Sequence, residues 1–304
     1  MHDMGAKAEG AYTRRVISST RRQDIRGVDY NIREWGDPSA PLLVLLHGHR
    51  DASSTFQFVV DLFRHEWRVV CPDWRGFGHT AWAPGGYWYQ DYLADLDALL
   101  DKLSPDAPVR LAGHSLGGNM SNVYAGVRPE RVVRVCSLDG FGLRTRGAED
   151  TPGHLEKFLK AWREPVPSPR PYPNVEAMAD RLMQGNKNLT RDKALFLAAH
   201  QHIVRDDGSL VWSFDPAHSR PFATLHRVDE WAACWRAIAC PALWIGSDRV
   251  FPPSMQSDTL SFEWRLEQVK DVTFHRLAGT GHNVHHDAPE KVAELVEDFF
   301  APTR

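Results

Sequence analysis

The segment Gly113-His114-Ser115-Leu116-Gly117 carries the clearest fold signal in this chain, because of the residues on either side of it. The apolar run 109–112 before it predicts a buried strand, and 118–125 after it predicts the start of a helix. A serine on a sharp turn between a strand and a helix is a nucleophile elbow, whose strained backbone points the hydroxyl outward. Flanking glycines are needed because the backbones pass closely there. A serine- and glycine-rich turn without chemistry gives the same five residues, so the rest of the chain must separate the two interpretations.

Strand-like runs recur along the chain with helix-like segments between them; the first alternates like a half-exposed strand, and the others are mainly apolar. The runs are 28–35, 42–46, 67–71, 109–112, 132–138, 242–245 and 272–277. Apolar residues from Tyr92 to Leu103 recur at the three- and four-residue spacing of an amphipathic helix, and another helix opens at Pro289. This alternation predicts an α/β fold with a mostly parallel sheet and helices on both faces. In such sheets, ligands bind at the carboxyl ends of the strands.

One segment interrupts the alternation and predicts a cap inserted between two core strands. It has prolines at every second position from Pro165 to Pro173, helix-like pieces at 175–183 and 191–202, and a hairpin signal around Gly208. Residues 1–25 are polar and lack the apolar region of a secretion signal. We therefore expect a flexible N-terminal tail (1–25), a core (26–140 and 236–304) and a cap (141–235).

Composition narrows the classes of partner. The 304 residues are 42% hydrophobic with a net charge of −3, which gives no reason to expect nucleic acid. No apolar run approaches the ~20 residues of a membrane span, and no Cys or His pair has metal-ligand spacing. The four cysteines require no oxidising compartment. We expect a cytoplasmic protein that acts on a small molecule without a metal or membrane; the sequence leaves the oligomeric state open.

A serine hydroxyl is a weak nucleophile until a base takes its proton and a third group orients that base. Among the 15 histidines, His282 fits the base best, because it follows the last strand-like run in the flexible turn Gly279-Thr280-Gly281. His285 and His286 lie nearer the next helix, so we expect them to pack or to line the pocket. His114 points away from the nucleophile in an elbow, and we expect it to pack.

Two carboxylates are candidates for the group that orients His282. Asp248 follows the strand 242–245, and Asp139 follows the strand 132–138. The chain order Ser, Asp, His fits either of them. We favour Asp248, because its short Gly-Ser-Asp turn suits a carboxylate that reaches an imidazole, and we keep Asp139 as the alternative acid. Either one would fix the tautomer of the imidazole.

The developing oxyanion needs backbone donors. We expect the N–H groups of Leu116, directly after the nucleophile, and of His49, in the loop after the strand 42–46. The side chains of His49 and Arg50 either face the substrate or lie in a solvated loop. The aromatic cluster of Trp82 and 87–89 forms either an acyl pocket or an exposed packing patch.

Taken in order, these motifs resemble the α/β-hydrolase superfamily. They are His47-Gly48, Asp73-x-Arg75-Gly76-x-Gly78, the 113–118 elbow, Gly246-Ser247-Asp248 and Gly281-His282 with Pro289-Glu290. The resemblance covers about 28–300 outside the cap and is closest to the serine hydrolase-like and esterase groups with a helical cap. It implies an eight-stranded sheet, a Ser115–His282–Asp248 triad, an acyl-enzyme and no cofactor.

The expected reaction is hydrolysis of a carboxylic ester, a thioester or a lactone of a small apolar or aromatic substrate. Ser115 stands where haloalkane dehalogenases and epoxide hydrolases of this superfamily have an aspartate. Asn283 follows His282, where carbon–carbon bond hydrolases usually have tryptophan. Motif retention does not prove hydrolysis. A carbon–carbon bond hydrolase, a cofactor-free dioxygenase and a receptor that kept the triad are the alternatives.

Overall fold

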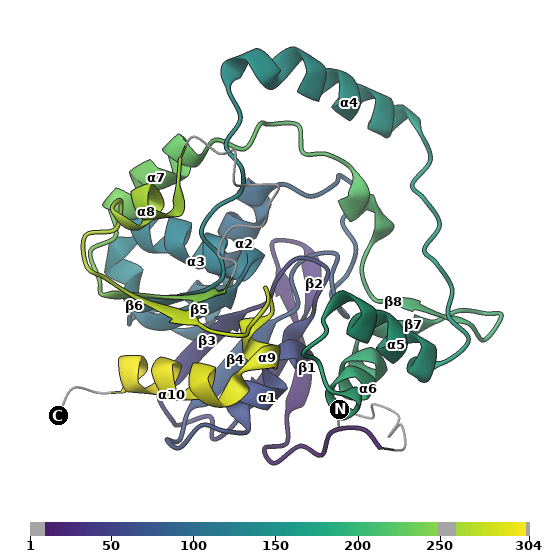
Figure 1. Cartoon of the computed structure of the whole chain (residues 1–304), viewed down its shortest axis with the longest axis horizontal. Coiled ribbons are helices and arrows are strands. Elements are labelled where there is room, and N and C mark those ends of the chain that lie inside the picture. Colours follow the sequence, from purple (N-terminus) through teal and green to yellow (C-terminus); the bar gives the residue numbers. More distant parts are fainter. Residues whose placement is uncertain (1–9, 249–259, 302–304) are drawn as a thin grey trace.

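A computed structural model describes residues 10–248 and 260–301 (Figure 1). Eight strands form one sheet in the order β1-β2-β4-β3-β5-β6-β9-β10. Their bounds are β1 Ser19–Ile25, β2 Val28–Trp35, β3 Leu42–Leu46, β4 Arg68–Pro72, β5 Val109–His114, β6 Val132–Leu138, β9 Ala242–Ser247 and β10 Val272–Leu277. β2 pairs antiparallel with β1 and β4, and all other neighbours are parallel. The predicted α/β fold with a mostly parallel, eight-stranded sheet is confirmed.

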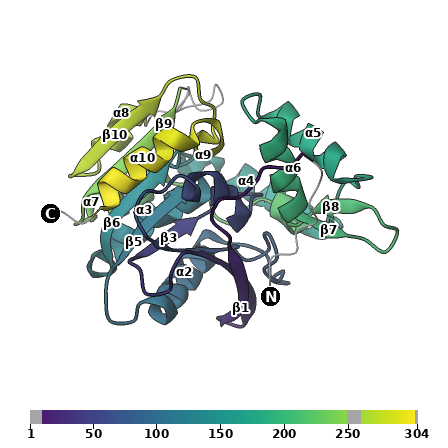
Figure 2. The same cartoon turned by 90° about the horizontal axis from the view of Figure 1, so that it is seen from below.

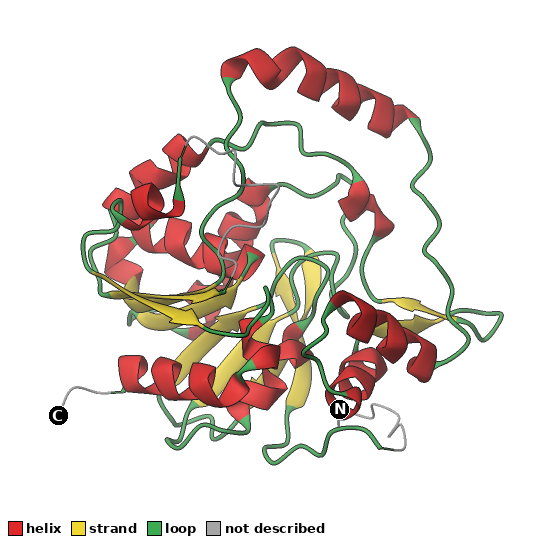
Figure 3. Ribbon diagram, viewed as in Figure 1, coloured by secondary structure: helices red, strands yellow, loops and turns green. Residues whose placement is uncertain are grey.

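Helices cover both faces of this sheet (Figure 3). Their bounds are α1 Gln57–Val60, α2 Tyr89–Leu103, α3 Leu116–Val127, α7 Val228–Arg236, α8 Phe262–Leu266, α9 Val284–Asp287 and α10 Pro289–Phe300. The burial of β3 on both of its faces explains why its sequence is continuously apolar. Val44 and Leu46 enter the core under α2, α3, α7 and α8, whereas Leu43 and Leu45 enter the core under α1 and α10. Successive side chains of a strand point to opposite faces, so a central strand buried on both needs apolar residues throughout.

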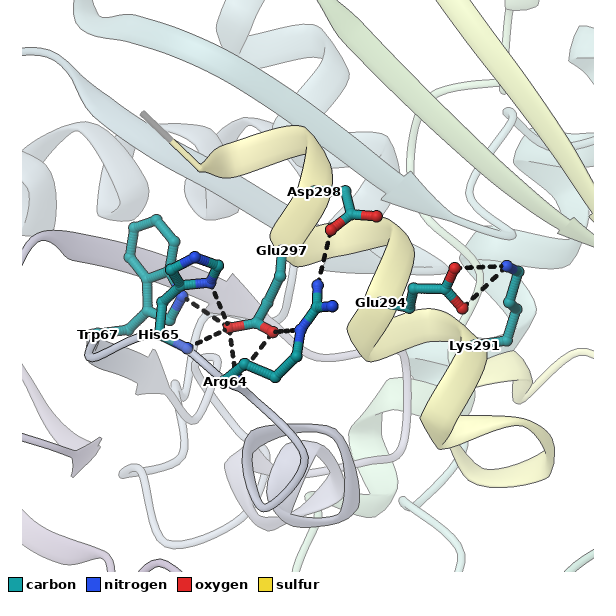
Figure 4. Close-up of polar contacts among 7 residues, drawn as sticks. All are labelled: Arg64, His65, Trp67, Lys291, Glu294, Glu297 and Asp298. Atoms are coloured by element: carbon teal, nitrogen blue, oxygen red, sulfur yellow. Dashed lines mark hydrogen bonds and ion pairs between the residues drawn. The ribbon is translucent and has the colours of Figure 1, made fainter. Parts of the chain in front are cut away.

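Hydrogen bonds and an ion pair join the C-terminal helix α10 to the segment just before β4 (Figure 4). The buried carboxylate of Glu297 accepts hydrogen bonds from the backbone N–H groups of Arg64 and His65, both at 2.8 Å. The Arg64 guanidinium adds an ion pair at 3.1 Å. Because the buried charge has several donors around it, the cost of removing it from water is offset.

The N-terminal segment is more ordered than the predicted tail. Residues 19–25 form β1, an edge strand paired along its length with β2. Before it, the Tyr12 ring packs edge-on against Phe58 at 4.9 Å, and the Val16 N–H donates to Asp61 at 2.7 Å. The prediction of a flexible tail is therefore wrong for this part of 1–25; residues 1–9 lie outside the described residues.

The insertion between β6 and β9 contains a long helix, a helical pair and a hairpin. The elements are α4 Thr151–Arg163, α5 Val175–Gly185, α6 Arg191–His200, β7 His202–Val204 and β8 Leu210–Trp212. In Figure 1, α4 stands apart from α5 and α6, and Figure 2 shows α5, α6 and the hairpin together at one side of the sheet. None of the helices in 10–248 and 260–301 is both long and apolar enough to cross a membrane.

The last helix of the predicted cap belongs to the core layer. Val228, Ala232 and Trp235 of α7 are buried in the same cluster as Met120 and Tyr124 of α3. The two helices touch through backbone: a Cβ added at Gly126 would lie 1.9 Å from the carbonyl oxygen of Cys234. The predicted boundary at residue 235 therefore places the end of the insertion too late.

Candidate active site

Ser115 occupies a strained turn between β5 and α3. Its backbone angles are φ 51° and ψ −111°, which residues other than glycine rarely adopt. A Cβ at Gly113 would lie 2.2 Å from the carbonyl carbon of Gly117, and one at Gly117 would lie 2.0 Å from Leu46 O. The flanking glycines are thus required sterically, as the elbow interpretation predicts. The Ser115 N–H donates to Leu138 O at 2.9 Å, which ties the turn to the end of β6.

His282 lies after β10 and is oriented by a carboxylate. Its Nδ1 forms a 2.7 Å hydrogen bond with Oδ2 of Asp139. The Asp139 side chain is 5% exposed, whereas the His282 side chain is 56% exposed. The other oxygen, Asp139 Oδ1, accepts from the Ser247 N–H at 3.0 Å. With Nδ1 held by the carboxylate, Nε2 is the ring nitrogen that remains for proton transfer.

We therefore correct the expectation that Asp248 is the partner of His282, since Asp139, the alternative acid, stands in that place. β6 is the immediate neighbour of β5 in the sheet, and β9 lies one strand further away. Asp139 also has a positive φ of 50°, so the chain turns sharply where β6 ends. The carboxylate of Asp248 instead accepts from the Gly279 N–H at 2.5 Å, in the turn before His282.

Two buried histidines lie next to His282. His114 Nε2 forms a 2.9 Å hydrogen bond with the carbonyl oxygen of His282, and its ring lies 4.3 Å from that of His285. Burial lowers the pKa of both His114 and His285 well below the ordinary value, so both are neutral at pH 7. The expectation that His114 packs agrees with its 3% exposure. Its bond to His282 also fixes the backbone of the candidate base.

Ser115 and His282 line one cavity of about 510 Å³. Its remaining walls come from the core and from the insertion. The core contributes the loop after β3, the end of β5, and α9 with the residue before it; the insertion contributes α5, α6, the end of β8 and the loops beside them. The residues are His49, Arg50, Asp51, His114, Tyr172, Arg181, Leu182, Gly185, Asn186, Leu189, Leu197, Gln201, Trp212, Phe214, Asn283 and His286. A Cβ at Gly48 would lie 3.3 Å from that of Ser115, so the loop with the predicted oxyanion donor His49 lies against the elbow. Leu116, the other predicted donor, begins α3.

The predicted aromatic cluster lies elsewhere. Trp82, Tyr87 and Trp88 line a second cavity of about 430 Å³ together with Trp162 and Phe222 of the insertion. Tyr89 stacks on Phe222 at 4.4 Å. Neither Ser115 nor His282 is among the residues that line this cavity. The cluster therefore packs against the insertion and does not form the wall around the candidate nucleophile.

One group of described residues has potential metal-ligand geometry. Ligand atoms of Asp51, His114 and His285 lie within 4.8 Å of one another. Two metal–ligand bonds of about 2.1 Å span at most about 4.2 Å, so a cation there would have to draw the side chains together. Asp51 is also engaged already, because its Oδ1 accepts from Gln201 Nε2 at 2.8 Å. The expectation that no metal takes part stays a prediction.

Sequence reasoning missed the contribution of the insertion to the site. Arg181, Asn186 and Gln201 reach the cavity from α5, from the turn after it and from the end of α6. Nothing in their local sequence marks them, because they lie within an ordinary helix or directly after one. Only the docking of the helical pair beside the sheet brings them to Ser115.

Comparison with known proteins agrees with this architecture. A family model described as "Alpha/beta hydrolase family" matches residues 43–295. The chain is 25% identical to the serine hydrolase-like protein of Danio rerio, over 95% of this chain and 90% of that one. It is also 25% identical to the (E)-2-((N-methylformamido)methylene)succinate hydrolase of Acinetobacter baylyi, over 95% and 100%. The thioesterase domain from the curacin biosynthetic pathway has the same fold, with a TM-score of 0.79 at 23% identity, over 92% of this chain and 98% of that one.

Proposed function

This chain belongs to the alpha/beta hydrolase family, and we propose that it is a serine hydrolase that cleaves a carboxylic ester through an acyl-enzyme on Ser115. One observation carries the proposal. The strained serine of the elbow shares a cavity with an imidazole whose Nδ1 is hydrogen-bonded, at 2.7 Å, to a buried carboxylate. Nucleophile, base and orienting acid are the three groups that a serine mechanism requires.

In the first step, the Ser115 hydroxyl attacks the ester carbonyl while His282 Nε2 takes its proton. The negatively charged Asp139 stabilises the imidazolium that forms. The N–H groups of Leu116 and His49 are the proposed donors to the oxyanion. Collapse of the tetrahedral intermediate breaks the bond to the alcohol oxygen, which leaves with the proton from His282. Water, activated by the same imidazole, then releases the acid and restores Ser115.

The insertion acts in this proposal as a cap over the site. Support comes from the cavity wall, to which α5 contributes Leu182 and α6 contributes Leu197. These leucines, with Trp212 and Phe214, give the substrate an apolar surface. A small ester with an apolar part fits such a wall, and a thioester or a lactone passes through the same acyl-enzyme.

The test compares Ser115→Ala with the unchanged protein on a panel of p-nitrophenyl esters. We expect the substitution to reduce kcat by at least about 10³-fold, because it removes the nucleophile and leaves only the oxyanion donors and binding. Ser39→Ala, in the exposed turn between β2 and β3, is the matched control and should retain full activity. A fluorophosphonate probe should label the unchanged protein and the control but not Ser115→Ala. Undiminished turnover by Ser115→Ala would overturn the mechanism.

A further inference from the structure

Two arginines line the Ser115 cavity without an acidic partner. Arg50 comes from the loop after β3 and Arg181 from α5. Within the described ranges, neither guanidinium forms an ion pair or a hydrogen bond. Arg75, which follows β4, shows the contrast, since it pairs with Asp95 at 2.5 Å and with Asp91 at 3.3 Å.

The charge on the cavity wall is therefore positive. Asp51 is the one carboxylate among the described lining residues, against two guanidinium groups. Its Oδ1 is already occupied, because it accepts from the Ala52 N–H at 2.9 Å and from Gln201 Nε2 at 2.8 Å. Both arginines are exposed residues, so their attraction for an anion is screened by water and salt but is not cancelled by an acidic partner.

The backbone at Arg50 gives a second, independent indication. Its φ is 58°, in the left-handed region that favours glycine. Strained positions of this kind cluster at active sites and ligand clamps. The guanidinium of Arg50 lies over the ring of Phe214, at 5.5 Å from its centroid, so an aromatic face of the cavity wall directs it.

We propose that this cavity takes esters that carry a second, anionic group, a carboxylate or a phosphate, held by Arg50 and Arg181. The planar, forked guanidinium suits such groups because it donates two parallel hydrogen bonds to their oxygens. A cavity of about 510 Å³ holds a small molecule of this kind, with its ester at Ser115 and its apolar part against Leu182 and Trp212. The inference rests on the proposed function and narrows its substrate class.

The experiment uses ester pairs that differ only in charge. Each pair contains the monomethyl ester of a dicarboxylic acid, from succinate to adipate, and the methyl ester of the corresponding acid amide. Proton or methanol release gives kcat/KM for both. We expect the unchanged protein to prefer the anionic member of the best pair by at least about tenfold, and the preference to shrink as ionic strength rises. Methyl 3-phosphonopropanoate, compared with the succinate ester, shows which anion is preferred.

Variants then connect the preference to the two arginines. Arg181→Gln should reduce the ratio of the two kcat/KM values, and Arg50→Gln/Arg181→Gln should bring it close to one. Arg205→Gln, on the exposed turn between β7 and β8 and outside the cavity, should keep the full ratio. Equal kcat/KM for both members in the unchanged protein, or a preference that survives in the double variant, would overturn the inference while leaving serine catalysis intact. A lack of Ser115-dependent turnover of any ester would instead contradict the proposed function, and the inference with it.

Discussion

At the scale of single residues, the carboxylate of Asp139 has two roles at the end of β6. Oδ2 holds Nδ1 of His282, and Oδ1 accepts from the Ser247 N–H, which joins the ends of β6 and β9. An amide in its place keeps most of this geometry, but it can donate to Nδ1 and thereby favour the wrong imidazole tautomer. In the proposed mechanism it also cannot balance the charge of the imidazolium.

We therefore expect Asp139→Asn to reduce kcat strongly, by up to about 10⁴-fold, with little change in the unfolding midpoint. Asp248→Asn is the matched control: its amide oxygen can still accept from the Gly279 N–H, so kcat should stay within a few-fold. Steady-state kinetics on the best p-nitrophenyl ester, together with thermal unfolding, measure both. The opposite order of effects would return the orienting role to Asp248.

Local sequence could predict the elbow and His282 but could not choose between the acids. Ser115 and His282 lie in short motifs whose glycines predict the turn that each residue needs. Asp139 and Asp248 both follow a strand, and what separates them is the order of strands in the sheet, which places β6 beside β5. That order depends on contacts between residues far apart in the chain. The place of Arg181 in the cavity wall could not be predicted for the same reason.

At the scale of elements, the contact between α3 and α7 depends on the lack of a side chain at Gly126. A Cβ there would lie 1.9 Å from the carbonyl oxygen of Cys234, which is backbone and cannot rotate away. Gly126→Ala should therefore lower the free energy of unfolding by at least about 2 kcal/mol, because α7 must shift from its place in the core. Urea denaturation monitored by circular dichroism measures this change.

Gly153 provides the matched control, because it is also a helical glycine. It lies in α4, is exposed, and an added Cβ would meet nothing within 4 Å. Gly153→Ala should be neutral or should stabilise by up to about 1 kcal/mol, since alanine favours the helix and restricts the unfolded chain. Equal effects of the two substitutions would show that helix propensity, and not the contact with α7, limits position 126.

The elements that sequence reasoning missed lack a hydrophobic signal. β1 reads Ser-Thr-Arg-Arg-Gln-Asp-Ile and buries only its last residue, as an edge strand facing solvent can. Such a segment cannot be told from a polar tail until β2 pairs with it. The buried strands β3 and β5 were predictable because each of their faces must be apolar. α7 was assigned to the cap from its position along the chain. That position does not determine the layer in which a helix packs.

At the scale of the whole molecule, a buried histidine cluster joins segments from distant parts of the chain. The Thr55 hydroxyl, in the short helix Ser53–Phe56, lies 2.8 Å from His285 Nε2 and 2.6 Å from His286 Nε2. His114, at the end of β5, packs against His285. The cluster thus brings together Thr55 from the first third of the chain, His114 from the strand before the elbow, and the two histidines that follow His282. These contacts suit neutral imidazoles, because a proton on each ring would add like charges where water is excluded.

This arrangement predicts that stability falls on acidification below pH 6.5. Burial holds the pKa of His114 and His285 well below the ordinary value, so the folded chain binds fewer protons than the unfolded chain in this range. The free energy of unfolding must therefore rise with pH there. Because they stay neutral when folded, these two histidines contribute roughly 2 kcal/mol to the loss between pH 6.5 and 5.5. Other histidines whose pKa burial also lowers, among them His286 of the same cluster, add to this loss. Urea unfolding at fixed ionic strength across pH 5.0–7.5 measures it.

A substitution in the cluster separates this cause from the titration of carboxylates. His285→Gln removes one buried imidazole and keeps a polar group near Thr55, so it should lower stability at pH 7 but reduce the loss between pH 6.5 and 5.5 by about 1 kcal/mol, the contribution of one histidine. His275→Gln, an exposed position on β10, should leave the slope unchanged. Asp and Glu ordinarily titrate below this window and contribute mainly at lower pH. If His285→Gln leaves the slope of the free energy of unfolding against pH unaltered between pH 5.5 and 6.5, this imidazole accepts its proton without unfolding. The network around Thr55 would then have to open to water while the sheet stays folded.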